Sequence, residues 1–279
     1  MEKALVTDGV SATPRSLGGV RAPDETAHRA TALLRPGILA FGGTITETDL
    51  HAHHTVQILA ANTPLTVMDA SGVHHHGTVV IVPADAPHRI DGGATHGAAL
   101  YLDPETIAGA AADRRAHTRG WTSGVHASVV DPARTALLDQ VTAIVADLRC
   151  DRETPPPIAR HNAVTEALRV LPSLVHDRSI RGADIARRVG LSPARLSHLF
   201  TDQVGIPLRP YILWLRLRVA IIRVRSGDDL AAAADAAGFD NSAHLTRTCR
   251  RTFGLFPAAL DRDDLWDLGD GSWTADSAT

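Results

Sequence analysis

Histidine is the residue type in this sequence that is best suited to chemistry, and it is concentrated in one region. Eight of the 15 histidines lie between residues 51 and 96. His51 and His53 are two residues apart, so both side chains would point to the same face of an extended strand. His88 on a facing strand could add a third imidazole. Three imidazoles form a typical site for Zn, Ni, Cu or Fe, or they could hydrogen-bond an organic ligand.

Other polar residues of this region add little to such a site. We interpret the run His74–His76 as the polar tip of a hairpin. Carboxylates that could act as acid or base are few: Glu47 and Asp49 precede the histidine pair, and Asp85 lies shortly before His88. The sequence therefore favours binding over catalysis.

Short β-type runs make up residues 36 to about 101 and would position these histidines. Turn signals such as Asn62-Thr63-Pro64 and Asp91-Gly92-Gly93 separate them. Regularly spaced short strands are typical of a β-sandwich or a small barrel. Residues 1–35 are polar and irregular, and we expect an N-terminal arm there. The expected strands are Gly37–Phe41, Val56–Leu59, Leu65–Met68, Thr78–Val82 and Ala98–Leu102.

The hydrophobic period becomes helical after Pro132. The first expected helix ends near Cys150, a Pro-rich break follows at Thr154–Pro157, and a second helix covers Ala159–Val175. The stripe on the first helix is wider than one face of a β-domain needs, so we predict that this helix pairs with its mate in a homodimer. The stripe consists of Leu137, Leu138, Val141, Ile144, Val145 and Leu148.

From Ile180 onward the sequence predicts helices throughout and contains an internal repeat. Residues 185–200 and 232–249 each read as a short helix, a glycine, a capped turn and a second helix with a buried leucine. Ser192 caps the second helix of the first unit, and Asp240 or Asn241 caps that of the second. One long apolar helix over 208–227 joins the two helix-turn-helix units. This arrangement indicates a domain that places two helices in DNA major grooves.

Residues 180–258 resemble the DNA-binding domain of the AraC/XylS family of bacterial transcription regulators. The matching positions are Ile185-Ala186, Gly190-Leu191-Ser192, Leu196, Leu199-Phe200, Gly205, Tyr211, Leu215-Arg216, Ala220, Gly238-Phe239, Arg247, Phe253-Gly254 and Pro257. The resemblance implies that the DNA-facing residues are Ala194, Ser197, His198, Ser242, Ala243, His244, Thr246 and Arg247. Arg247 is the candidate for a bidentate contact to guanine, with a phosphate contact as the alternative. Candidates for backbone contacts are Arg195, Arg250 and Arg251.

The sequence departs from the family pattern in the second unit. Ala233 stands where the family carries a large aliphatic residue, and Cys249 stands where it carries an aromatic one. The last helix ends in Ala259-Leu260-Asp261 instead of an aromatic-Arg pair. We therefore expect the second unit to bury less apolar area and to dock loosely. Cys249 has no second cysteine near it in sequence, so we interpret it as a buried structural thiol.

Residues 36–102 resemble a cupin, the β-barrel that many regulators of this kind carry as a sensor domain. His51-Ala52-His53 with Gln57 is similar to the first cupin motif, and Gly77–Pro83 with Pro87-His88 is similar to the second. The resemblance implies a metal shell of His51, His53 and His88. Gln57 stands where metal-binding cupins carry Glu, which makes it a weaker fourth ligand. Asn62-Thr63-Pro64 replaces the glycine turn of the first motif.

Composition and charge fit a folded protein with a segment that binds a polyanion. Hydrophobic residues make up 44% of the 279 residues and charged residues 21%, which argues against disorder of the whole chain. Residues 177–260 carry 13 Arg and 7 Asp, a net charge of +6, whereas residues 1–176 carry −4 and residues 261–279 carry −5. The apolar runs are too short for a bilayer, a signal-peptide core is lacking, and two cysteines form no disulfide framework. We therefore expect a cytoplasmic protein without membrane contact.

We expect an α+β multidomain chain, in which a cupin-like β-barrel with flanking helices precedes an all-α double helix-turn-helix domain. The sequence predicts a transcription regulator, an activator in our interpretation, that binds promoter DNA and RNA polymerase and responds to a small molecule or metal. The alternative is a metal-dependent cupin enzyme fused to a DNA-binding domain. The expected divisions are an arm (1–35), a cupin-like sensor (36–130), dimerisation helices with a Pro-rich linker (131–176), the DNA-binding domain (177–260) and an acidic flexible tail (261–279).

Overall fold

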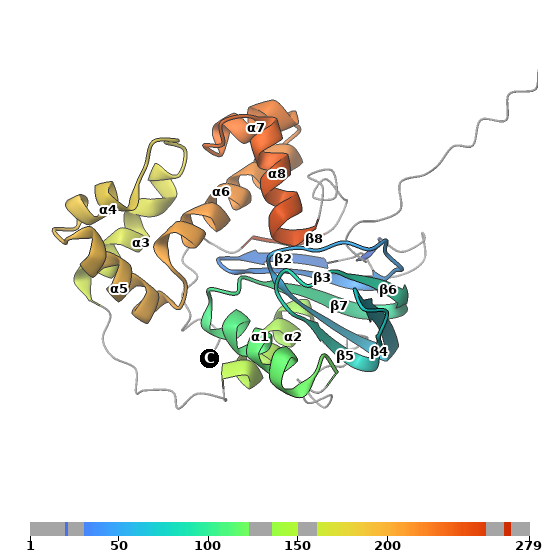
Figure 1. Ribbon diagram of the computed structural model, residues 1–279. Helices are drawn as coiled ribbons and strands as arrows, with labels where there is room; N and C mark the ends of the chain where they lie inside the picture. The colour runs from blue at the N-terminus through green and yellow to red at the C-terminus, as the bar shows by residue number, and fades with distance from the viewer. Residues whose placement is uncertain (1–19, 22–30, 123–135, 150–160, 255–264, 269–279) are drawn as a thin grey trace, which may run out of the picture.

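The computed structural model describes residues 20–21, 31–122, 136–149, 161–254 and 265–268. It shows a curved β-sheet with helices on both faces (Figure 1). Most of the expected arm, the Pro-rich break at Thr154–Pro157 and most of the expected acidic tail lie outside the described residues. Within the described ranges, no helix combines the length and the apolar character needed to cross a membrane.

The described strands form one open sheet. They are β1 Val20–Arg21, β2 Thr31–Arg35, β3 Ile38–Ile45, β4 Val56–Asp69, β5 His74–Val82, β6 His88–Gly92, β7 Ala94–Leu102 and β8 Leu265–Asp267. Their order is β5-β4-β7-β3-β2-β8, with β1 paired to β3 and β6 paired to β4. Because β5 and β8 stand at opposite ends of this order, the described strands do not form the closed cupin-like barrel that we predicted.

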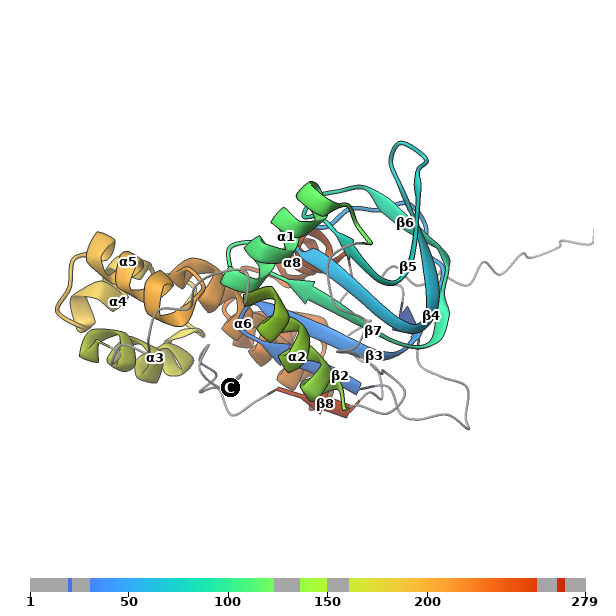
Figure 2. The ribbon, with the colours of Figure 1, turned by 90° about the horizontal axis from the view of Figure 1, so that it is seen from below.

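Helices cover both faces of the sheet, and this explains why it does not need to close. Successive residues of a strand point to opposite faces. Ile58 and Leu100 therefore pack with α1 (Ile107–Arg119) and α2 (Leu137–Arg149), which lie side by side under the sheet (Figure 2). Leu59 and Tyr101 belong to the core on the other face, which also contains the C-terminal helices. Burial by helices removes both apolar faces from water without a barrel.

The helix that we expected after Pro132 is confirmed as α2, but its apolar stripe lies inside the chain. Five of the six stripe residues are at most 8% exposed and pack in the core that α1 and the sheet share. Leu138 alone among them faces outward, at 45% exposure. The stripe is therefore intrachain core and no longer supports the homodimer. The homodimer stays a prediction, which light scattering can test.

Strand β4 joins two of the expected strands into one. Val56–Leu59 and Leu65–Met68 both belong to it, and Asn62-Thr63-Pro64 lies within the strand. The turn predicted there is therefore wrong. The register with β5 shifts between Ala60 and Leu65, as it does at a β-bulge. A proline, which has no N–H to donate, is tolerated at such an irregularity.

The sheet extends further toward both ends of the chain than we expected. β2 begins at Thr31, inside the predicted arm, and β8 lies inside the predicted tail. β8 pairs in parallel with β2. Arg35 Nη2 lies 2.7 Å from Asp267 Oδ1, and Trp266 packs edge to face on Phe41. The C-terminal segment thus returns to the N-terminal sheet.

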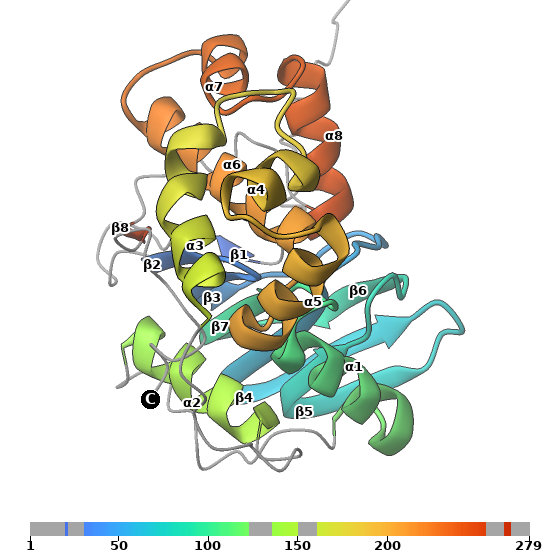
Figure 3. The same ribbon diagram turned by 90° about the vertical axis from the view of Figure 1, so that its left-hand side faces the viewer.

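The C-terminal helices confirm the predicted tandem units (Figures 1 and 3). Ser192 and Asn241 act as N-caps, because each side-chain oxygen accepts a bond from the backbone N–H three residues further on. Gly205 and Gly254 end the same two helices with a positive φ. The helices are α3 Asn162–Leu174, α4 Gly182–Arg188, α5 Pro193–Val204, α6 Leu208–Arg225, α7 Leu230–Ala236 and α8 Ser242–Phe253.

Candidate functional site

The face of α5 that we expect to meet DNA is open to solvent. The exposed residues are Ala194, Arg195, Ser197 and His198. Leu196, Leu199 and Phe200 are buried on the opposite side. The capped N-terminus carries a partial positive charge, which suits a phosphate group. The structure thus places all the predicted residues of this helix where they can reach a nucleic acid.

In α8 the predicted residues differ in exposure. Ala243, Arg247, Arg250 and Arg251 are exposed, whereas Ser242, His244 and Thr246 are half-buried. The His244 ring lies 3.0 Å from Asp240 Oδ2, measured from Nδ1, and packs edge to face on Phe239. His244 is therefore held by its own unit, and Arg247 is the more accessible of the two.

The core of the second unit is completed from outside it. Ala233 and Cys249 are fully buried, and burial raises the pKa of the Cys249 thiol to about 12. This supports the interpretation of Cys249 as a structural thiol. Phe253 packs edge to face on Tyr101 of β7 and on Trp214 of α6. The second unit thus packs through Phe253 against the N-terminal sheet as well as against α6.

The three candidate histidines lie close together, but His51 and His53 are not on a strand as we predicted, whereas His88 is. His51 and His53 lie in the irregular segment between β3 and β4, and His88 is the first residue of β6. An isolated bridge joins two of them: the His51 N–H donates to His88 O at 2.9 Å, and the His88 N–H donates to His51 O at 2.8 Å. One ring nitrogen of each histidine lies within 4.8 Å of the other two.

Main-chain carbonyls determine which nitrogen of each ring carries the proton. Nδ1 donates in every case, from His51 to Asp49 O at 2.8 Å, from His53 to Thr55 O at 2.9 Å and from His88 to Ala86 O at 2.9 Å. A neutral ring that donates from Nδ1 has a lone pair on Nε2. Nε2 of His51 and Nε2 of His53 are buried without a hydrogen-bond partner.

Burial keeps the three rings neutral. Desolvation lowers the pKa of His51, and it lowers the pKa of His53 to about 4 and that of His88 to about 3. Repulsion from the neighbouring His51 adds to the last two shifts. All three imidazoles therefore present lone pairs at neutral pH.

Gln57, the predicted fourth group, is buried beside the cluster. Its Nε2 donates to Tyr101 Oη at 3.0 Å, and its Oε1 lies 3.0 Å from His88 Nε2. Two acceptor atoms at this distance need a proton or a cation between them. Either the amide turns so that its N–H donates to His88, or a cation binds both atoms.

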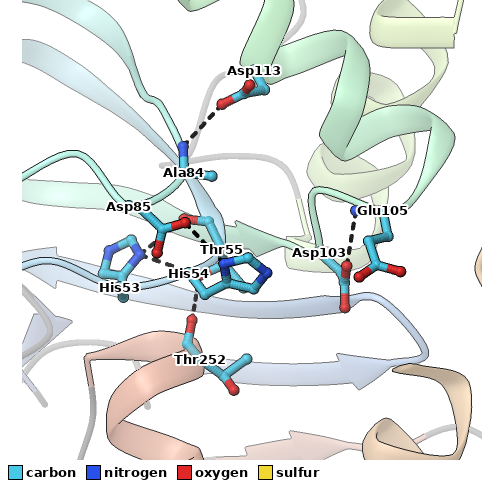
Figure 4. Close-up of polar contacts among 9 residues, drawn as sticks. All are labelled: His53, His54, Thr55, Ala84, Asp85, Asp103, Glu105, Asp113 and Thr252. Carbon is cyan, nitrogen blue, oxygen red and sulfur yellow. Dashed lines mark hydrogen bonds and ion pairs between the residues drawn. The ribbon is translucent and has the colours of Figure 1, made fainter. Parts of the chain in front are cut away.

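This donor set fits a transition-metal ion. Three neutral imidazoles, two of them with orphaned nitrogens, suit Zn, Ni, Cu or Fe. Within the described residues, the cluster contains no carboxylate. Asp85 pairs instead with His54, 3.0 Å from Oδ2 to Nδ1 (Figure 4), and Asp49 contributes its carbonyl. The arrangement is suited to binding a cation.

The run His74–His76 begins β5 directly after the hairpin turn, as predicted. Its rings contact three different partners. His74 lies 3.1 Å from Asp91, His75 lies 3.0 Å from Asp69, and His76 lies 2.9 Å from Thr66. The run is therefore part of the polar surface of the hairpin.

Sequence reasoning missed two neighbours of the histidine cluster. Tyr101 lies 5.3 Å from His53 between ring centroids. Gly254, at the end of α8, approaches His51 and His53 from the other half of the chain. A glycine after a helix signals only a cap, so no local pattern could connect it with residues some 200 positions earlier.

Comparison with known proteins places the C-terminal helices in a known domain family. Residues 185–263 match the helix-turn-helix domain family. The transcriptional activator NphR of a Rhodococcus species is 30% identical over 138 residues, and the arabinose operon regulatory protein of Escherichia coli K12 is 30% identical over 104 residues. These stretches are 49% and 37% of this chain but 38% and 35% of those proteins. The chain thus spans less than half the length of either relative.

Solved structures match the chain at lower identity, and one of them covers most of its length. ToxT from Vibrio cholerae matches 81% of this chain and 97% of its own, with a TM-score of 0.42 and 10% identity. A regulator with an AraC-type DNA-binding domain from Chromobacterium violaceum matches 36% of this chain and 89% of its own, with a TM-score of 0.33 and 27% identity. The family match and the two relatives thus show that the C-terminal part of this chain contains a helix-turn-helix domain similar to those of transcription regulators.

Proposed function

We propose that this chain is a sequence-specific transcription regulator whose N-terminal domain (the sensor domain, residues 31–149) responds to a metal ion or a small molecule. The observation that carries the proposal is the pair of capped helices α5 and α8, which expose polar faces inside a matched DNA-binding domain. Both relatives are named as regulators, and one as an activator. We therefore propose that the chain activates promoters through contact with RNA polymerase.

The two helices would each enter a major groove, with their N-terminal halves at the base edges. The exposed guanidinium of Arg247 has the planar donors that match guanine. Arg195, Arg250 and Arg251 are exposed on the same helices and would position the phosphate backbone. The net charge of +6 over residues 177–260 would draw DNA to this surface.

We propose the histidine cluster as the effector site. His51, His53 and His88 would hold a divalent metal ion, with Gln57 as the fourth group, and the ion would supply a positive charge that links the three rings. The main-chain bonds of the three Nδ1 atoms leave a lone pair on each Nε2, and one ring nitrogen of each histidine lies within 4.8 Å of the other two. An organic ligand with N–H or O–H donors is a second candidate, because the same orphaned nitrogens could accept its hydrogen bonds. The matched family and relatives favour regulation over the alternative of a cupin enzyme.

Two experiments test this proposal. Genome-wide mapping of bound DNA should give a recurring sequence, and DNA recovered without any shared sequence would contradict a specific regulator. Elemental analysis of untagged protein should find a transition metal that is lost in the double variant His51→Ala, His88→Ala. The matched control is His74→Ala, His76→Ala, which removes two exposed histidines of the hairpin and should keep the metal.

A further inference from the structure

The C-terminal end of α8 is docked on the loop that carries His51 and His53. The His54 N–H donates to Arg251 O at 2.8 Å. The N–H and hydroxyl of Thr55 donate to Thr252 O at 3.1 and 2.8 Å, and Figure 4 shows these two residues side by side. These carbonyls belong to the last turn of the helix, where they have no partner within the helix itself. The second DNA-reading helix is thus bonded to the histidine loop.

Gly254, which ends α8, lies directly over the imidazoles. A Cβ at this position would lie 3.1 Å from Cδ2 of His51, 3.2 Å from Cδ2 of His53 and 3.7 Å from Nε2 of His51. Its φ of 69° is also one that glycine adopts most readily. The end of α8 therefore forms a wall of the histidine site, and an added side chain would press on the rings of His51 and His53.

A series of buried aromatic rings extends this contact into the connecting helix α6. Tyr101 lies 5.3 Å from His53 and 6.2 Å from Phe253 between ring centroids, and Phe253 lies 5.2 Å from Trp214. The Trp214 indole N–H donates to Asp103 Oδ2 at 3.1 Å. A movement of α8 away from the sensor domain must therefore disturb the surroundings of both the histidines and Trp214.

We infer that a divalent cation in the histidine site and the docking of α8 stabilise each other, so that the effector fixes the second reading helix on the sensor domain. This inference rests on the proposed function, because it takes His51, His53 and His88 as the effector site. By linkage the effect is reciprocal, so a change that weakens docking weakens cation binding by the same factor.

Two observations give the direction of the coupling. With α8 docked, Nε2 of His51 and Nε2 of His53 are buried without a partner, which costs free energy. A cation would satisfy both atoms in place. The C-terminus of a helix also carries a partial negative charge, which favours a cation beside Gly254. The cation therefore favours the docked state, and its removal favours release.

The first test compares Zn²⁺ binding by full-length wild type, Gly254→Ala and Gly190→Ala, measured by calorimetry against a competing chelator. Gly190 has a similar φ of +70° but no atom within 4 Å of an added Cβ. Its variant therefore carries the same backbone strain without touching the histidines. We expect Gly254→Ala to bind Zn²⁺ about tenfold more weakly or worse, and Gly190→Ala to bind like wild type.

The second test needs no variant, because it follows hydrogen exchange in the wild type. The His54 and Thr55 amides donate to α8, so Zn²⁺ should slow their exchange several-fold. Unchanged exchange at saturating Zn²⁺, or equal Zn²⁺ affinity of Gly254→Ala and wild type, would overturn the inference and leave the proposed regulator intact. A wild type that binds no Zn²⁺ would overturn both the metal site and the inference, while DNA binding would still be judged by mapping.

Discussion

At the scale of single residues, the angle around a helix separates the roles of the exposed arginines. Arg247 follows buried Leu245 by two positions, which is about 200° around the helix. Arg195 directly precedes buried Leu196, so the two side chains are about 100° apart around the helix axis. Both arginines are exposed. In the proposed complex, Arg247 would therefore point away from the protein toward the groove, and Arg195 would point sideways toward the phosphates.

Replacing these arginines should have different effects on DNA binding. Arg247→Ala should cost about 1–3 kcal/mol on the specific site and much less on random DNA, because base contacts carry the sequence preference. Arg195→Ala should weaken binding to both DNAs and reduce its salt dependence. Titrations at several salt concentrations measure both effects. Equal losses on both DNAs for Arg247→Ala would mean that α8 contacts only the backbone.

The buried histidines should make folding of the metal-free protein depend on pH. The pKa of His53 falls from 6.5 to about 4 on folding, so below pH 6.5 the unfolded chain takes up a proton that the folded chain refuses. The contribution of His53 to the free energy of unfolding is therefore fully present above pH 6.5 and is lost as the pH falls toward 4. At about 1.4 kcal/mol per pKa unit, His53 alone accounts for roughly 3 kcal/mol.

Urea unfolding in EDTA at pH 7.5, 6.0 and 5.0 measures this loss. His53→Ala should reduce the pH dependence without abolishing it, because the alanine takes up no proton in either state while His51 and His88 keep their lowered pKa values. His76→Ala, at an exposed position, should keep the wild-type slope. A wild-type stability that is constant over this range would contradict the shifted pKa.

At the scale of elements, the sequence predicted the helices whose ends are determined by local caps and whose buried faces are strongly apolar. The helical period and the caps at Ser192 and Asn241 predicted α5 and α8. α1 was missed because its buried face consists mostly of alanines, which give no apolar contrast. The convergence of three histidines was predicted correctly, and so was a strand for His88, but His51 and His53 lie in a loop held by main-chain bonds to β6. Gly254 joins that site through tertiary contacts that no local pattern encodes.

Phe253 should matter for docking as well as for stability. It is 3% exposed and packs on Tyr101 and Trp214, so Phe253→Ala should lower the free energy of unfolding by about 3–5 kcal/mol and speed exchange of the Thr55 amide. Phe200→Ala is the control, since Phe200 is equally buried but packs on Tyr211 beside the first unit. It should lose similar stability without affecting Thr55. Faster exchange in both variants would show general loosening instead.

At the scale of the whole molecule, both reading helices end on the sensor domain. Gly205, the cap of α5, accepts a bond from the Ile107 N–H of α1 at 3.3 Å, and the end of α8 accepts bonds from His54 and Thr55. The helix α6 joins the two units directly. The distance between the two reading helices is thus fixed both by α6 and by their contacts with the sensor domain.

We therefore expect two protected half-sites about one helical turn apart, on the same face of the duplex. Insertion of five base pairs between them should abolish simultaneous binding, because half a turn moves one half-site to the opposite face. Footprinting on the natural site and on the site with the five-base-pair insertion checks this expectation. Undiminished protection of both half-sites after the insertion would show that the two units move independently.

The pairing of β8 with β2 has a further consequence for how the molecule can open. The helices α3 to α8 are, in topological terms, an insertion between two parts of one sheet, tethered at both ends. Only ten residues separate Gly254 from Leu265, and they span at most roughly 35 Å when fully extended. A released α8 therefore stays close to its docking surface at a high effective concentration. The DNA-binding domain would rotate over a short range and return quickly. The effector would therefore control the orientation of this domain relative to the sensor domain, and the two would not separate fully.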